Sequence, residues 1–261
     1  HFPIVTGLDS PGRGGLTISG TAIGGVQSPT YFISGGTLYR YPSTVLAIGI
    51  TSSDEPVTIV TNGIQGHQLL FASGSSTYCF DLNSNTLTNV GVGHAVAFLN
   101  GYGIRVNRVL NQFEFSAPFD FTSWNALDVV PREDASDTWQ TVLAYREELW
   151  LFGSETTSIY YNDTDGDTPF LPNESAFIQM GIISPYSACI VGGAPMWLGQ
   201  DASGSCITFR ASGYSPVRVS THAVEYAMQS GQVGALVTAE GCTYQQAGHV
   251  FYELTLPSIE G

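Results

Sequence analysis

Apolar and polar residues alternate along most of the chain in short runs, and the runs come in groups of three with tight turns between them. The clearest group consists of Trp139–Tyr145, residues 149–153 and residues 158–161. Alternation with a period of two, bounded by short turns, is typical of antiparallel strands joined as hairpins. The pattern therefore predicts an all-β chain, with this group as one three-stranded meander.

Similar groups recur along the chain, each with an apolar or aromatic middle run. The middle runs centre on Leu38, Leu70, Ile104, Trp150, Trp197 and Phe251. Their spacing rises from about 30 to about 50 residues and so approaches the ~40–50 residues of propeller repeats. One meander cannot bury both of its faces alone, so several must stack. The repeat predicts a β-propeller-like array of antiparallel meander blades, with an irregular β-sandwich as the alternative.

We expect residues 1–261 to form a single domain of about five to six blade-like units. The poorest unit lies in residues 1–56, and the last unit stops after its second run, residues 250–254. This predicts an array that is truncated within its last blade, and a chain that is a fragment of a longer protein.

One short helix is predicted over residues 221–230, between two β units. Ser220 or Thr221 is suited to cap its N-terminus. The apolar residues that share one face of this helix are Ala223, Ala227 and Met228.

The composition agrees with a folded, strand-rich protein. Hydrophobic residues make up 43% of the chain and aromatic residues 12%, while charged residues make up only 11%. Disordered chains need the opposite balance of high charge and few aromatic residues. The chain has no run of about 18 apolar residues, so we expect no membrane segment.

The chain is strongly acidic, with 22 acidic and 8 basic residues and a net charge of −14, and every basic residue is an arginine. An acidic surface repels phosphate backbones, which argues against a nucleic-acid-binding protein. The same charge suits either a passage through which DNA slides without sticking or plain solubility.

The four cysteines lack the spacing of a zinc site. Cys189, Cys206 and Cys242 lie in strand-like runs and are expected to be buried thiols. A disulfide between any two of these and Cys79 stays open.

Several segments in the second half of the chain carry motifs in a fixed order. They include residues 148–162 (ELWLFGSETTSIYYN), 176–181 (AFIQMG), 219–225 (VSTHAVE) and 244–252 (YQQAGHVFY). These segments resemble the packaged DNA stabilisation proteins of P22-like phages, which are also described as tail hub or head-completion proteins. The resemblance covers residues 113–257, a little over half of the chain, and is loose in the residues before them.

The resemblance implies a structural protein in the virion of a tailed phage and not an enzyme. Such proteins form a homo-oligomeric ring, a hexamer by resemblance, and help to seal the portal channel so that packaged DNA is retained. The implied partners are the portal adaptor, the tail needle or fibre and the tailspikes. DNA would meet at most a non-sticky channel, and no membrane is involved.

The turn at residues 162–167 (NDTDGD) resembles the start of a calcium-binding EF-hand loop, because acidic oxygens alternate around a glycine. With Asp163 as the first position, Glu174 falls at the twelfth, but Gly166 falls at the fourth instead of the sixth. A solvated acidic turn is the plainer interpretation, and whether residues 163–167 bind calcium stays open.

The five histidines have no partner at metal-site spacing, so His222 and His249 are expected to be structural. No complete GxSxG motif and no phosphate-binding loop occurs in the sequence. We therefore expect no catalytic, cofactor-binding or metal-ligating residues, and no cofactor.

Aromatic side chains suggest the alternative function, a carbohydrate-binding or glycoside-processing β-propeller. Trp124, Trp150, Tyr160 and Tyr161 are of the type that stacks on sugar rings. Their alternating spacing among leucine and phenylalanine neighbours predicts core positions instead.

Overall fold

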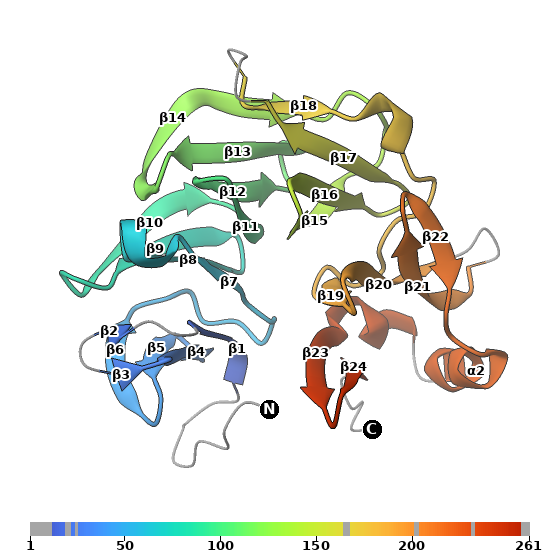
Figure 1. Cartoon of the computed structure of the whole chain (residues 1–261), viewed down its shortest axis with the longest axis horizontal. Helices are drawn as coiled ribbons and strands as arrows, with labels where there is room; N and C mark the ends of the chain where they lie inside the picture. Colours follow the sequence, from blue (N-terminus) through green and yellow to red (C-terminus); the bar gives the residue numbers. More distant parts are fainter. Residues whose placement is uncertain are drawn as a thin grey trace. The chain divides into compact units, whose positions relative to one another are not determined.

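The computed structural model describes residues 12–18, 22–23, 26–163, 168–200, 204–230 and 233–256. Antiparallel sheets of short strands make up most of them (Figure 1). The chain divides into two compact units, His1–Pro131 and Arg132–Gly261, and each unit holds its own sheets. The expected single domain over residues 1–261 stays a prediction.

The described residues of the N-terminal unit form three four-stranded sheets, each an up-and-down meander. The first consists of β1 (Gly12–Thr17), β4 (Thr30–Ser34), β5 (Thr37–Arg40) and β6 (Thr44–Ile48), with the small hairpin of β2 (Ala22–Ile23) and β3 (Val26–Gln27) inserted after β1. The second consists of β7 (Thr58–Thr61), β8 (Gln68–Ser73), β9 (Ser76–Asp81) and β10 (Thr86–Val92), with the one-turn helix α1 (Gly63–Gly66) after β7. The third consists of β11 (Ala95–Leu99), β12 (Tyr102–Asn107), β13 (Gln112–Ala117) and β14 (Asp120–Pro131). The first strands β1, β7 and β11 lie side by side, so the sheets follow one another as propeller blades do (Figure 1).

In its described part, the C-terminal unit has two four-stranded sheets and one two-stranded sheet. One sheet consists of β15 (Trp139–Tyr145), β16 (Glu148–Gly153), β17 (Thr157–Asn162) and β18 (Phe170–Pro172). The next consists of β19 (Cys189–Val191), β20 (Ala194–Gln200), β21 (Cys206–Ser212) and β22 (Ser215–Arg218). The hairpin consists of β23 (Glu240–Gln246) and β24 (His249–Thr255), and the helical segments are η1 (Glu174–Ala176), α2 (His222–Ser230) and η2 (Val233–Thr238). The predicted antiparallel, blade-like meanders are confirmed.

Two-residue turns with positive φ at both positions close the tightest hairpins. Asn100 and Gly101 have φ values of 49° and 93°, and Gly192 and Gly193 have values of 55° and 76°. Turns of this mirror-image type match the right-handed twist of the strands that they join, which explains the asparagine and the glycines. The Asn-Gly pair at residues 62–63 is different, because Gly63 begins α1 instead of closing a hairpin.

The central strand β8 is buried on both faces, because its sheet packs between two others. Leu69 and Phe71 pack against the first sheet, in a cluster that includes Leu38 of β5. Leu70 and Ala72 point to the opposite face and pack against the third sheet. A strand that is covered on both faces becomes almost continuously apolar, which is why the middle runs are so clear in the sequence.

Large aromatic rings fill the space between the two four-stranded sheets of the C-terminal unit. Trp150 and Phe152 of β16 lie in one buried cluster with Trp197 of β20. The ring centroids of Trp150 and Trp197 are 6.4 Å apart, and those of Phe152 and Trp197 are 5.2 Å apart. All three side chains are at most 1% exposed. Edge-on and tilted aromatic pairs at such distances add to the free energy of burial itself.

The prediction of three strands per unit is wrong by one strand, because each four-stranded sheet has an outer strand that the sequence pattern did not reveal. In four of the sheets these outer strands are β10, β14, β18 and β22. An outer strand has one neighbour and faces solvent, so apolar alternation is not required of it. In β22 three of the four residues are exposed, and β18 spans three residues and ends at Pro172.

The predicted helix is confirmed as α2, but its predicted apolar face is wrong. Met228 is buried, whereas Ala223 and Ala227 are exposed. The second buried residue of the helix is the charged Glu225. None of the described helices is long and apolar enough to span a membrane.

Candidate functional site

A polar cluster joins α2 to the sheet that precedes it. Arg218, the last residue of β22, donates from Nε to Glu225 Oε1 (2.7 Å) and from Nη2 to Glu225 Oε2. Ser220 Oγ donates to Glu225 Oε1 (2.6 Å) and accepts from the backbone N–H of Thr208 in β21 (3.0 Å). These contacts fix the start of the helix on strand β21, and they account for the serine and the glutamate of the VSTHAVE motif.

Glu225 is the buried member of this cluster, with 5% of its surface exposed. The hydrogen bonds from Arg218 and Ser220 hold the pKa of its carboxyl below the usual value. His222 lies at the exposed rim, with Nδ1 2.7 Å from Arg218 Nη2 and 3.5 Å from Glu225 Oε2. The carboxylate is therefore engaged by its neighbours and is suited to positioning the helix.

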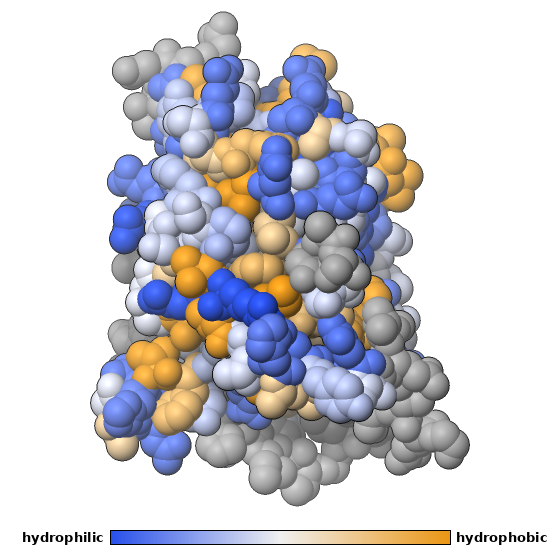
Figure 2. Space-filling model, turned by 90° about the vertical axis from the view of Figure 1, so that its right-hand side faces the viewer, coloured by the Kyte–Doolittle hydropathy of each residue, from blue (hydrophilic) through white to orange (hydrophobic). Residues whose placement is uncertain are grey.

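Exposed apolar side chains surround this polar cluster. Val217 of β22, the following Val219, and Val224 and Tyr226 of α2 are between 43% and 75% exposed. Figure 2 shows apolar positions next to strongly hydrophilic ones on the side of the molecule where β22 and α2 lie in Figure 1. We call these four residues the α2–β22 surface. Exposed apolar groups beside fixed polar ones are typical of contact sites between proteins.

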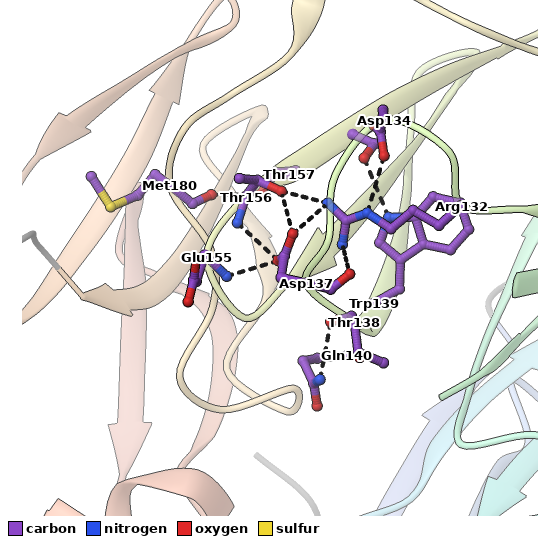
Figure 3. A network of polar contacts seen from close by, with 11 residues as sticks. Arg132, Asp134, Asp137, Thr138, Trp139, Gln140, Glu155, Thr156, Thr157 and Met180 are labelled. Carbon is purple, nitrogen blue, oxygen red and sulfur yellow. Dashed lines mark hydrogen bonds and ion pairs between the residues drawn. The ribbon is translucent and has the colours of Figure 1, made fainter. Parts of the chain in front are cut away.

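A second polar cluster lies where the chain enters β15 (Figure 3). The guanidinium of Arg132 is fully buried and lies 3.0 Å from Asp134 Oδ1 and 3.0 Å from Asp137 Oδ1. It also donates to the backbone carbonyl of Asp137 (3.0 Å) and to the hydroxyl of Thr156. Its carbon Cζ is 5.3 Å from the ring centroid of Trp139. Arg132 thus connects the segment that precedes β15 to the turn between β16 and β17.

Asp137 is the partner that completes this second cluster. Its Oδ2 accepts the backbone N–H groups of Glu155 (2.9 Å) and Thr156 (3.1 Å), and its Oδ1 accepts the Thr156 hydroxyl (2.8 Å). Burial alone would raise the pKa of this carboxyl, but those hydrogen bonds and the charge of Arg132 lower it below the usual value. Gly153 is required beside them, since a Cβ there would lie 2.2 Å from Asp137 Oδ2.

The N-terminal unit also contains buried arginines that, like Arg132, each hold several partners. Arg105 donates from Nε to Glu114 Oε2 (2.8 Å), and its Cζ is 4.3 Å from the ring centroid of Trp124. Arg13 donates to the carbonyls of Glu55 (2.8 Å) and Gly35 (2.8 Å). Arg13, Arg105 and Arg132 are all at most 9% exposed. A planar guanidinium with several donors can satisfy many acceptors at once, and lysine cannot replace it there.

Sequence reasoning did not find these arginine clusters. Their acidic and carbonyl partners are scattered along the chain, so no spacing rule points to them. The one available signal was compositional, since the basic residues include eight arginines and no lysine.

The histidines named in the sequence analysis lie apart from one another in the C-terminal unit. His222 belongs to the α2 cluster, and His249 begins β24 with its ring 6.3 Å from that of Phe251. In the N-terminal unit, burial and the charge of Arg108 lower the pKa of His94. Within the residues that the structure describes, no three His, Cys, Asp or Glu side chains gather as a metal site would require.

The acidic turn at residues 163–167 falls largely outside the described part of the chain, since residues 164–167 are not described. Asp163 is described, and its backbone N–H donates to Pro169 O (2.8 Å). Glu174 lies in η1. Whether residues 163–167 bind calcium therefore stays an open question.

The aromatic residues considered for sugar binding are mostly in the core. Trp150 is 1% exposed and Tyr160 is 4% exposed, so neither presents a ring face to solvent. Tyr161 is 41% exposed, and Trp124 is covered by Arg105. Within the C-terminal unit, neither Trp150 nor Tyr160 offers an exposed ring for sugar stacking beside Tyr161.

The cysteines differ in burial, and all four are free thiols. Cys79 and Cys206 are buried, and burial raises the pKa of Cys79 to about 12. Cys189 is half-buried, and Cys242 is exposed. The prediction that Cys242 is buried is therefore wrong, and none of the residues of its strand β23 is buried.

A family model and two solved structures with TM-scores of 0.50 and 0.52 support the same architecture. A family model described as "Bacteriophage P22 Gp10, beta-propeller" matches residues 2–259. The designed protein Ika8 has a TM-score of 0.52 and 7% identity, over 97% of this chain and 72% of that chain. The N-terminal domain of Nup159 has a TM-score of 0.50 and 8% identity, over 92% and 72% of the two chains. The WD40 β-propeller domain of Doa1 has a TM-score of 0.43 and 11% identity, over 77% of this chain and 63% of that chain. No curated protein matches the chain.

Proposed function

Because the chain belongs to the bacteriophage P22 Gp10 β-propeller family, we propose that it is a structural protein of a tailed-phage virion. In this proposal it acts as a tail hub that seals the portal channel and retains the packaged DNA. The family match over residues 2–259 is the observation that carries the proposal. The net charge of −14 supports it, since a channel wall that repels phosphate lets DNA pass without binding it.

We further propose that the protein works through its surfaces and not by catalysis. Two polar residues of the family-like segment 219–225, Ser220 and Glu225, are engaged in a structural cluster with Arg218. The exposed apolar residues of the α2–β22 surface support contacts with other proteins. The proposed partners are further copies of the chain, in a ring of six, together with the portal adaptor, the tail needle or fibre and the tailspikes.

Cryo-electron microscopy of the native particle tests this proposal directly. We expect six-fold density for this fold immediately below the portal. Particles assembled without the protein should release their DNA, which a nuclease-protection assay measures. Particles that retain DNA without the protein, or a monomer located elsewhere in the particle, would contradict the proposal. Saccharide binding or turnover by the purified chain would favour a carbohydrate-active propeller instead.

A further inference from the structure

The α2–β22 surface presents apolar and basic side chains side by side (Figure 2). Tyr226 is its most exposed member, at 75%, and its three valines are between 43% and 50% exposed. Arg218 lies between two of these valines in the sequence, and His222 lies on the same helix as Tyr226. A molecule that covers the apolar residues therefore also meets the basic ones.

The charges of the polar cluster are distributed unevenly between its exposed and buried members. The side chains of Arg218 and His222 are 39% and 89% exposed, whereas that of Glu225 is 6% exposed. The acid of the cluster is thus the least accessible of the three, although the whole chain has a net charge of −14. Charges attract or repel a partner mainly at short range in salt, so the accessible groups decide the preference. This surface therefore favours a carboxylate on its partner over a basic group.

The contact between His222 and Arg218 fixes which nitrogen of the imidazole carries the hydrogen. His222 Nδ1 lies 2.7 Å from Arg218 Nη2, and an arginine has donors but no acceptor. In this contact Nδ1 is therefore the acceptor, and in the neutral ring the hydrogen is on Nε2. Because the side chain is 89% exposed, this Nε2–H group is accessible to an acceptor on another molecule.

The surface is held in place at both ends of the helix. At its start, Ser220 Oγ accepts the backbone N–H of Thr208 and donates to Glu225. Near its end, Met228 packs into a buried cluster of the same unit. A surface that is already ordered loses less conformational entropy when a partner binds. An exposed tyrosine on such a surface, here Tyr226, is a common centre of binding energy between proteins.

From this arrangement we propose that the α2–β22 surface binds a segment of another protein in which an aspartate or glutamate is flanked by large apolar residues. The carboxylate of the segment accepts the Nε2–H of His222 and lies close to the guanidinium of Arg218. The apolar side chains of the segment cover Val224 and Tyr226, which provides most of the affinity. A second copy of this chain fits less well, because two chains that each have a net charge of −14 repel one another. The inference rests on the proposed function, in that the protein works through its surfaces, and it specifies the chemistry of one partner.

Selection from a random peptide library tests the proposal on the whole chain and on its Val224→Asp variant. The variant adds a carboxylate to the α2–β22 surface, in the first turn of a helix, where an aspartate is well tolerated. We expect the original chain to enrich peptides with an aspartate or glutamate between leucine, isoleucine or phenylalanine residues, and we expect these peptides not to bind the variant. Enrichment of basic peptides, of peptides that bind both chains equally, or of no peptide would overturn the proposal.

The enriched peptide then tests the contact with His222 directly. Replacing its acid by the corresponding amide should weaken binding roughly tenfold, as measured by fluorescence anisotropy. His222→Ala should weaken binding of the acidic peptide by a similar factor, and His222→Gln, which keeps an N–H donor, should restore most of it. On the His222→Ala chain the amide peptide should lose little further affinity, because the two changes remove the same contact. Two independent, multiplying losses would contradict the contact.

A matched valine in the other unit provides the control. Val45 of β6 is 55% exposed, compared with 50% for Val224, so Val45→Asp makes the same change of charge at a similar exposure. We expect the Val45→Asp chain to bind the peptide like the original chain, and a loss of binding there would mean that net charge alone decides. A dimer of the original chain that Val224→Asp dissociates would assign the surface to a second copy and overturn the proposal. These measurements use the purified chain, so their failure leaves the retention of DNA to be decided on the particle.

Discussion

Two hairpins of the C-terminal unit, β16–β17 and β23–β24, are similar in sequence character but meet different surroundings. Both contain a family-like motif, and both place aromatic residues in their strands. In β16 the five residues from Leu149 to Gly153 are buried, whereas β23 and β24 contain no buried residue. The difference shows that an aromatic strand becomes core when another sheet covers it. The strand alone does not determine its own burial.

The largest effect is expected in the β16–β17 hairpin, when the ring of Trp150 is removed. Trp150→Ala removes a side chain that is 1% exposed and packs against Trp197. We expect a loss of about 3–5 kcal/mol in the free energy of unfolding, measured by chemical denaturation. The matched substitution on the β23–β24 hairpin is Phe251→Ala, with an expected loss of about 1 kcal/mol in the free energy of unfolding. Equal losses would mean that Phe251 in the β23–β24 hairpin is buried in solution.

The next largest effect concerns the polar cluster that fixes the turn between β16 and β17. Asp137→Asn leaves the buried Arg132 without the more buried of its two charged partners, and we expect a loss of about 3 kcal/mol in stability at neutral pH. Asp54→Asn, at an exposed position, serves as the control and should change little. If both variants unfold alike, the cluster does not stabilise the turn.

The same carboxylate predicts a pH dependence. The pKa of Asp137 is lowered in the folded chain, so its contribution is present above the pKa of the unfolded chain, about 4. The contribution is lost as the pH falls through the lower folded value. The stability difference between the original chain and Asp137→Asn should therefore shrink below about pH 4. A difference that is constant from pH 7 to pH 3 would assign the effect to packing.

A smaller effect is expected at the turn between β23 and β24. Gly248 has a φ of 81°, and a Cβ there would meet no atom within 4 Å, so the cost of Gly248→Ala is purely conformational. We expect a loss of about 1–2 kcal/mol. Ser154→Ala, in the β16–β17 turn, should have almost no effect because that turn needs no positive φ. Thermal unfolding of the two variants makes the comparison.

The smallest expected effect is a gain in stability. Ala247 also has a positive φ, 49°, which a residue with a Cβ rarely adopts without strain. Ala247→Asn would produce the Asn-Gly pair that this turn type prefers, and we expect a gain of about 0.5 kcal/mol. Thermal unfolding is again the measurement. A loss in stability would indicate that the two-residue turn is not the one formed in solution.

Much of the fold could be predicted from the sequence, because covered strands show their burial as apolar runs. The strand β15 begins and ends where the alternation predicted, and the ends of β16 and β17 lie within one residue of the predicted runs. The outer strands β10, β14, β18 and β22 could not be predicted in this way, since they face solvent on one edge and need no fixed apolar pattern. Their recognition requires knowledge of the strand beside them.

The polar clusters were less predictable than the strands. Arg218 and Glu225 are seven residues apart on a strand and a helix, and the chain turns between them. Arg132 and Thr156 are joined only because the β15–β16–β17 meander returns to its own starting point. Such pairs depend on tertiary contacts. The arginine-only composition was a signal that such clusters exist, but the spacing of residues along the chain did not show where they form.

The arginine-only set of basic residues has a practical consequence for following this protein in solution. No side chain provides a primary amine, so amine-directed acylating or cross-linking reagents have no lysine to modify. Trypsin can cleave only after arginine, and Arg13, Arg105 and Arg132 are enclosed in the folded units. Arg146, in the turn between β15 and β16, and Arg218, at the end of β22, are exposed by contrast. The order in which tryptic fragments appear would therefore record how each unit opens.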